Sequence, residues 1–239
     1  LIFDLDTLTG SEFWKSVAHT LLFAVIEMPL LIIIPFFIAF LLNHRLKGLG
    51  VCRSLIYLPA ILSISTVGII FVVLLDTNLG VINKIFHTDI PWLTKQPYQW
   101  ISIFLLSTWW GIGGNMVLFT AGLQGISKDL YEAADIAGVN KTRQFFTITL
   151  PLITPTIFFM LVTSIISGFQ YFMMAYIMVG RGTNYSAYYL AYYIYDKGFM
   201  DYQLGYASAM SWIMFVIVIA IVGLVVSTSK KWVHYLDQE

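Results

Sequence analysis

Five long apolar runs dominate this sequence of 239 residues and limit what it can fold into. A membrane-spanning helix needs about 20 mostly apolar residues. Five segments reach that length: 17–42, 54–75, 100–124, 152–179 and 204–228. Hydrophobic residues make up 59% of the chain and charged residues 11%, so too few polar side chains remain to cover a water-facing surface. The sequence therefore predicts an all-α bundle of membrane-spanning helices, with residues 1–239 as a single domain.

The basic residues of the loops divide unequally between the two sides of this bundle. One side carries Arg45, Lys47, Arg53, Lys128, Lys141, Arg143, Lys230 and Lys231. The other side carries Lys15, Lys84, Lys95, Arg181 and Lys197. Because Lys-rich and Arg-rich loops stay in the cytoplasm, we expect the 125–150 loop and the C-terminus there, and Leu1 outside. Five spans with an outside start, and no initiator Met, predict a sixth, N-terminal helix that this sequence does not contain.

Composition argues against several kinds of site. The net charge is zero and no basic run occurs, which argues against a nucleic-acid partner. The histidines are scattered over different spans and loops, so no metal site is predicted. Cys52 is the single cysteine and cannot form an internal disulfide. No convincing Ser–His–Asp arrangement occurs either, so we expect no catalytic residues and no enzyme activity.

The charged loop between the third and fourth runs has the signals of two short helices. Ser127 is a good N-cap, and Glu132 lies near the start, where the helix dipole favours an acid. Gly138 ends the first helix, Asn140 caps a second that reaches about residue 147, and Pro151 fits the first turn of the next span. This predicts a compact projection that serves as a lever for a cytoplasmic partner. The alternative is a loop helix that lies on the bilayer.

The same loop resembles a known family. Glu132-Ala133-Ala134, Gly138 and Ile148-x-Leu150-Pro151 resemble, with every spacing intact, the EAA motif of binding-protein-dependent ABC importer permeases. Five further segments resemble the carbohydrate branch of that family: "EFWKSVAHTLLFAV", "RSLIYLPAILS", "WWGIGGNMVLFTAGLQGISKDLYEAA", "SGFQYF" and "LGYASAMSW". The preceding Leu130-Tyr131 resembles the maltose and glycerol-phosphate type of subunit. One departure is Ala137-Gly138-Val139, where sugar permeases usually read Asp-Gly-Ala.

The resemblance implies a type I ABC importer permease fold in a bacterial cytoplasmic (inner) membrane. Its implied partners are a second homologous permease, two cytoplasmic ATP-binding subunits that hold ATP and Mg, an extracytoplasmic solute-binding protein and a sugar substrate. This chain has no G-x-x-x-x-G-K-[ST] loop, so we expect no cofactor of its own. The residues implied to couple it to the ATP-binding subunit are Glu132, Ala133, Ala134, Asp135, Gly138, Leu150 and Pro151.

Polar and aromatic residues inside the runs are the candidate substrate contacts, because polar groups in a membrane are costly and often functional. They are Glu27, Trp110, Asn115, Phe169 and Gln170. Glu27 lies about 15 Å deep at the rise of an α-helix, and it either lines the path or holds two helices together. Pro29 and Pro35 follow it, so we expect a kink or a local break in that helix. For the nearby Ser164, Ser167 and Gly168 we expect a packing role.

Two expectations concern the other loops, including 76–99. We expect Tyr188, Tyr189, Tyr192 and Tyr193 to belong to an aromatic belt at the membrane surface. The 180–203 loop either lies along the outer surface as a short helix or helps to dock the binding protein. The predicted function is import of a sugar or oligosaccharide. The alternatives are glycerol phosphate or another polar solute, and a secondary transporter, which should carry several coupling carboxylates in the membrane.

Overall fold

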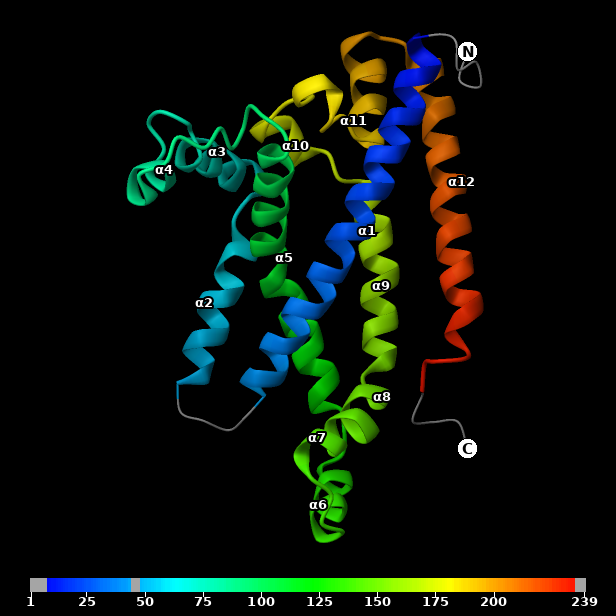
Figure 1. Cartoon of the computed structure of the whole chain (residues 1–239). Coiled ribbons are helices and arrows are strands. Elements are labelled where there is room, and N and C mark those ends of the chain that lie inside the picture. Colours follow the sequence, from blue (N-terminus) through cyan, green and yellow to red (C-terminus); the bar gives the residue numbers. More distant parts are fainter. Residues whose placement is uncertain (1–7, 44–47, 235–239) are drawn as a thin grey trace.

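The computed structural model describes residues 8–43 and 48–234 (Figure 1). Within those ranges the chain is helical and contains no strand. Three helices, including Ser11–Leu42 of the first, are long and apolar enough to cross a membrane. Up to two further spans are each divided by a sharp bend. The predicted all-α membrane bundle is therefore confirmed.

The first helix, α1 (Leu8–Leu42), runs unbroken through Pro29 and Pro35. The local break expected at these prolines is wrong. Packing along α5 supports the helix, and the Asn115 side chain from α5 bonds to a carbonyl beside Pro35. The helix therefore continues although proline lacks a backbone N–H.

The second apolar run is not one straight span. It forms α2 (Leu49–Ile61) and α3 (Ile64–Leu74), which meet at 96°. Leu62 and Ser63 have extended backbone between them, and the Trp110 indole Nε1 donates to the Leu62 carbonyl at 3.2 Å. The Leu62 carbonyl has no helical partner at the break, and this side-chain bond provides one. The prediction of a single helix over 54–75 is therefore wrong.

The fourth apolar run is also divided. It forms α9 (Thr154–Phe169) and α10 (Met173–Met178), and α10 packs on α3. The remaining elements are α4 (Val81–Phe86), α5 (Tyr98–Gln124), α6 (Lys128–Ile136), α7 (Lys141–Gln144), η1 (Phe145–Thr149), α8 (Leu150–Leu152), η2 (Thr183–Tyr185), α11 (Leu190–Tyr195), η3 (Asp196–Met200) and α12 (Leu204–Ser229).

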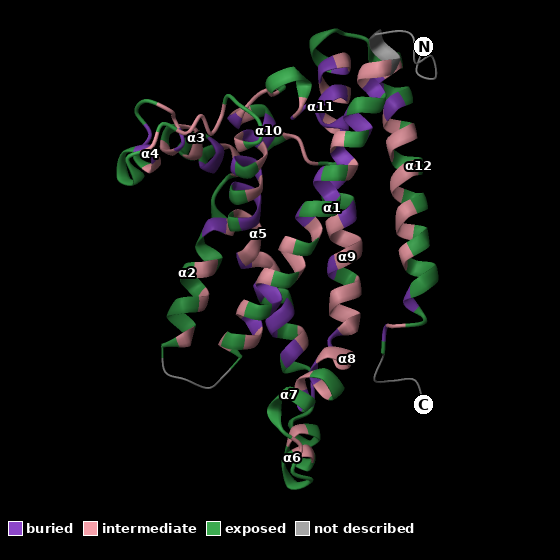
Figure 2. Ribbon diagram, in the orientation of Figure 1, coloured by how far each residue is buried: buried purple, intermediate pink, exposed green. Residues whose placement is uncertain are grey.

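Helix α5 is the centre of the bundle, with α1 and α2 packed along it. Gly113 lets α2 approach closely, because a Cβ there would lie 2.6 Å from the Ile56 carbonyl oxygen. Figure 2 shows burial concentrated on α1, α5 and the α11 end, whereas α12 is mostly exposed or intermediate. Exposed Trp212 and Leu224 on α12 have the apolar character that lipid tails solvate.

The tyrosine-rich segment between α10 and α12 is packed into the bundle. Tyr188, Tyr189, Tyr192 and Tyr193 are all at most 5% exposed, so their expected place in a surface belt is wrong. The alternative of a helix lying on the surface is wrong for the same reason. The α11 side packs on α1 and α12, and the Leu190 N–H donates to the buried Thr20 Oγ1 at 2.8 Å.

Candidate functional site: a projecting loop and a central cavity

Helices α6 and α7 project from one end of the bundle, opposite the end where α1 begins (Figure 1). Both carry the predicted N-caps. Ser127 Oγ accepts from the Asp129 N–H at 3.2 Å, and Asn140 Oδ1 accepts from the Arg143 N–H at 2.8 Å. These bonds provide partners for N–H groups that lie in the first turn of each helix and have no carbonyl acceptor there.

A glycine makes the turn between the two helices. Gly138 has φ +72°, in the left-handed region that favours glycine. The Val139 N–H donates to the Ala134 carbonyl at 2.9 Å, and the Gly138 N–H to the Asp135 carbonyl at 3.0 Å. These two bonds are the Schellman pattern of a helix C-terminus. The position predicted to stop the first helix therefore does so.

The EAA residues fall on two faces of α6. Glu132, Ala133 and Ile136 are exposed, and Ile136 has 89% of its surface exposed. We call these three residues the docking face, because the family resemblance predicts a partner contact at Glu132 and Ala133. Ala134 and Tyr131 are half-buried against the rest of the loop, where the Tyr131 hydroxyl lies 2.9 Å from Thr149 Oγ1. Sequence reasoning missed Ile136, although an isoleucine in a polar, water-accessible helix is a recognisable signal.

Asp135 is bonded within the loop. Its Oδ1 accepts from Lys141 Nζ at 2.6 Å and from Gln144 Nε2 at 2.5 Å. Hydrogen bonds from Lys141 and then from Gln144 hold the pKa of the Asp135 carboxyl below its usual value. The group is therefore ionised at neutral pH, as the lysine partner requires.

The exit from the loop differs from the prediction in one respect. After α7 the chain continues through the π-helix η1 into α8, which contains Leu150 and Pro151, and α9 then begins at Thr154 after a 56° bend. Leu150 is half-buried beside Ile153 and Phe119, at the base of the projection. The Leu-Pro pair thus lies before the bend and anchors the loop to the bundle.

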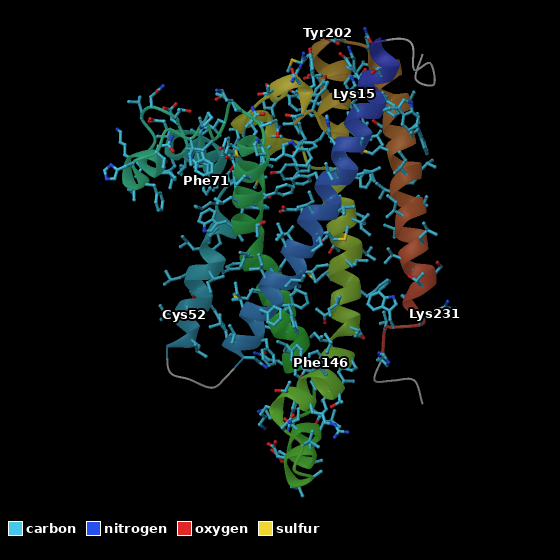
Figure 3. All side chains as sticks on the ribbon, in the orientation of Figure 1. Lys15, Cys52, Phe71, Phe146, Tyr202 and Lys231 are labelled. Carbon is cyan, nitrogen blue, oxygen red and sulfur yellow. The ribbon has the colours of Figure 1, made fainter. Side chains whose placement is uncertain are left out.

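A cavity of about 550 Å³ lies between α1, α3, α5, α9 and α10. Glu27, Trp110, Asn115 and Gln170, four of the five predicted substrate contacts, line it together. The fifth, Phe169, is 1% exposed and is not among the lining residues. Figure 3 draws the side chains of the described residues on these helices.

Two of these residues already use their donors within the protein. Asn115 Nδ2 donates to the Leu31 carbonyl at 2.9 Å, and Trp110 Nε1 donates to Leu62. Gln170 is exposed, and its side chain makes no hydrogen bond within the described part of the chain. Its amide is therefore available to a solute.

Glu27 is 4% exposed, and neither carboxyl oxygen meets a hydrogen-bond partner among the described residues. The Ser107 and Thr108 hydroxyls approach it without hydrogen-bond geometry. No Lys, Arg or His is among the described residues that line the cavity. A buried carboxyl without a cationic partner is costly. The Glu27 carboxyl group can therefore accept hydrogen bonds from a bound solute.

Several lining residues were assigned to packing or not singled out at all. Ser164, Ser167 and Gly168 all line the cavity, although a Cβ on Gly168 would meet Ala24 Cβ at 3.2 Å, which fits close packing. Tyr171 lines it as well, with a buried hydroxyl that has no partner within the described residues. Nothing in its sequence context separates this tyrosine from those in the packed segment between α10 and α12.

Comparison with known proteins places the chain in a family. The family described as "Binding-protein-dependent transport system inner membrane component" matches residues 7–235. A probable ABC transporter permease protein, YesP of Bacillus subtilis, is 38% identical over 98% of this chain and 78% of its own length. The arabinooligosaccharides permease AraP of the same organism is 32% identical, over 91% and 72%. The sn-glycerol-3-phosphate permease UgpA of Agrobacterium fabrum is 29% identical, over 95% and 79%.

Solved structures share the fold. A chain of a bacterial alginate ABC transporter, in complex with an alginate pentasaccharide-bound periplasmic protein, matches with a TM-score of 0.86. It is 21% identical and covers 96% of this chain and 85% of its own. The predicted importer permease fold is therefore confirmed, and the alternative of a secondary transporter is set aside. This chain belongs to the family of inner membrane components of binding-protein-dependent transport systems, and its function is that of a transport permease.

Proposed function

We propose that this chain and a second, similar permease form the translocation path of an ATP-driven importer for a sugar or oligosaccharide. The cavity carries the proposal. Its lining combines polar groups, from Ser164, Ser167 and Gln170, with the aromatic side chains of Trp110 and Tyr171. Amides and hydroxyls suit the hydroxyl groups of a sugar, and an aromatic face suits the CH surface of its ring.

The names of the relatives support a sugar and offer a second candidate solute. AraP is named for arabinooligosaccharides, whereas UgpA is named for sn-glycerol-3-phosphate. A phosphate calls for an Arg or Lys at the site. The described residues that line the cavity include neither, and Glu27 would repel an anion if ionised. A sugar is therefore favoured, unless the second permease supplies a cation.

The exposed residues of the projecting loop support contact with an ATP-binding subunit. The docking face would lie in a groove of one of two cytoplasmic ATP-binding subunits, which bind ATP and Mg. The small Ala133 lets another backbone approach, and Ile136 offers an apolar contact. The 125–150 loop and the C-terminus would be cytoplasmic, as the basic residues predict. An extracytoplasmic binding protein would then dock at the opposite end, including the 76–99 and 180–203 segments.

Transport follows from two arrangements of the spans. ATP binding inside and the loaded binding protein outside would favour opposite openings of one path. Helix α9 connects the projecting loop to the cavity. It follows the loop through α8, and it carries cavity residues such as Thr163 and Ser164. Movement of the loop can therefore change the cavity.

The experiment begins with the solute-binding protein of the same system. A thermal-shift panel of arabinotriose, lactose, glycerol 3-phosphate and galacturonate identifies the class of solute. Uptake of the bound probe is then measured in proteoliposomes that contain the complete transporter. The proposal expects a sugar to be bound and imported only with ATP. Import of glycerol 3-phosphate alone would support the second candidate, and import without ATP would overturn the proposal.

A further inference from the structure

A hydrogen-bond network lies within the turn between α6 and α7. Asp135 Oδ1 accepts from Lys141 Nζ and from Gln144 Nε2, at 2.6 Å and 2.5 Å. Gln144 Nε2 also donates to the Val139 carbonyl at 2.9 Å, and its Oε1 accepts from Lys141 Nζ at 3.3 Å. These bonds cross Gly138, the residue at which the chain reverses. The network therefore connects the end of α6 directly to α7.

The exposure of the three side chains indicates which of them contributes most to the stability of the network. The Lys141 and Asp135 side chains are 76% and 51% exposed, and such an ion pair alone stabilises little. Gln144 is 2% exposed, and each end of its amide is bonded within the turn. Removing a buried amide leaves its former partners unsatisfied, which costs more than loss of a surface pair. Gln144 is therefore the centre of the network, and Asp135 is its link to α6.

The network also separates Asp135 from the docking face. Glu132, Ala133 and Ile136 are exposed, and Glu132, the polar member, makes no side-chain hydrogen bond within the described residues. Asp135, by contrast, has both carboxylate oxygens bonded, since Oδ2 accepts from Lys141 Nζ at 2.8 Å. Its carboxylate is committed to the loop before any partner arrives.

We propose that Asp135 and Gln144 are positioning residues that fix the angle of α6 relative to α7. This inference rests on the proposed function of the loop as a lever. From α7 the chain runs through η1 and α8 into α9, where Thr163 lines the cavity. A fixed turn transmits a displacement of α6 along this path, whereas a loose turn lets α6 pivot without moving α9. The two residues serve coupling rather than contact with the ATP-binding subunit.

The contrasting role, direct contact of Asp135 with the ATP-binding subunit, makes different predictions. Loss of a contact weakens assembly, and a change at Lys141 cannot repair it. Loss of a positioning bond leaves assembly intact, weakens coupling, and is repaired when the pair is rebuilt. A double-mutant cycle separates the two.

The test uses the complete transporter in proteoliposomes. The variants are Asp135→Lys, Lys141→Asp, the two combined, and Gln144→Leu. Thr147→Ala is the control, since among the described residues its exposed hydroxyl bonds only to the Arg143 carbonyl of its own helical turn. Two quantities are measured: the amount of ATP-binding subunit that co-purifies, and the ratio of ATPase rates with and without the loaded binding protein.

The single variants and Gln144→Leu are expected to retain the ATP-binding subunit while the stimulation ratio falls about fivefold, the scale of coupled pairs. The charge-swapped pair should recover most of that ratio, and the control should not change. Loss of co-purification in Asp135→Lys that the swap does not repair would overturn the inference. Unchanged stimulation in all variants would also overturn it. The proposed function would survive either result if Glu132→Lys still abolished uptake.

Discussion

Asn115 on α5 donates its side-chain Nδ2–H to the carbonyl oxygen of Leu31 on α1 at 2.9 Å. In an α-helix that carbonyl accepts from the N–H four residues later, which here belongs to Pro35 and does not exist. The amide of Asn115 therefore replaces one backbone bond of another helix. It also connects the two helices that pack most extensively in the bundle, beside the cavity that Asn115 lines.

Asn115→Leu should leave the Leu31 carbonyl without a donor and lower the free energy of unfolding by about 1–3 kcal/mol. Adding Pro35→Ala to that variant restores the backbone N–H and should recover most of the loss. Thermal unfolding of the detergent-solubilised protein measures both steps. If Pro35→Ala gives the same change in the wild type and in the Asn115 variant, the two groups are not coupled.

Gln170 and Glu27 are expected to contact the solute, because both line the cavity and neither side chain has a hydrogen-bond partner within the described residues. Gln170→Ala and Glu27→Gln should each raise the transport KM about fivefold, the equivalent of one net hydrogen bond. Asn115→Ala should also change the solute affinity, because Asn115 lines the same cavity.

Thr163→Ser is the matched control for these variants. Thr163 lines the same cavity, and its hydroxyl donates to the Phe159 and Met160 carbonyls of its own helix, so this substitution keeps the hydroxyl and removes only a methyl group. The transport KM of this variant should not change. An unchanged KM in both Gln170→Ala and Glu27→Gln would remove these residues from the solute site.

Two adjacent glycines on α5 should respond differently to the same substitution. A Cβ at Gly113 would lie 2.7 Å from Tyr57 Cα, whereas a Cβ at Gly114 meets nothing within 4 Å. Gly113→Ala should therefore push α2 away and cost about 1–3 kcal/mol, as overpacking does. Gly114→Ala should be neutral or slightly stabilising. Thermal unfolding of both variants provides the comparison, and equal losses would contradict the close α2–α5 contact.

The orientation can be read from two exposed positions at opposite ends of the bundle (Figure 1 and Figure 3). Ile136 and Tyr202 are 89% and 84% exposed. In a Cys52→Ser background, a membrane-impermeant maleimide should label Tyr202→Cys in intact cells, or spheroplasts where an outer membrane is present. Ile136→Cys should react only after lysis. The reverse pattern would place the 125–150 loop outside and exclude a cytoplasmic partner there.

Sequence reasoning was most accurate where the signal is local. Caps at Ser127 and Asn140 and the turn at Gly138 follow from residue type and spacing, and all three occur where predicted. The apolar runs also predicted the approximate positions of the three unbroken spans and of the two bent pairs, because length and hydropathy suffice for that.

The bends and the use of polar side chains could not be read in this way. The break at Leu62 depends on an indole donor 48 residues away, and the continuity at Pro35 depends on Asn115. A hydropathy average over one segment carries no information on a side-chain bond from another segment. Tyr193 resembles a membrane-surface residue in its sequence context, whereas its burial depends on packing against α12 and against α1, which is far away in the sequence.

The proposed function requires that the 125–150 loop couples this permease to an ATP-binding subunit. Two variants test this coupling by uptake and subunit association: Glu132→Lys, which changes the docking face, and Gly138→Asp, which opposes φ +72° and alters the turn. ATP-driven uptake should be abolished in both variants. Less ATP-binding subunit should co-purify with Glu132→Lys, while the membrane part of both variants unfolds at the same temperature as the wild type. Normal uptake in both variants would contradict the claim.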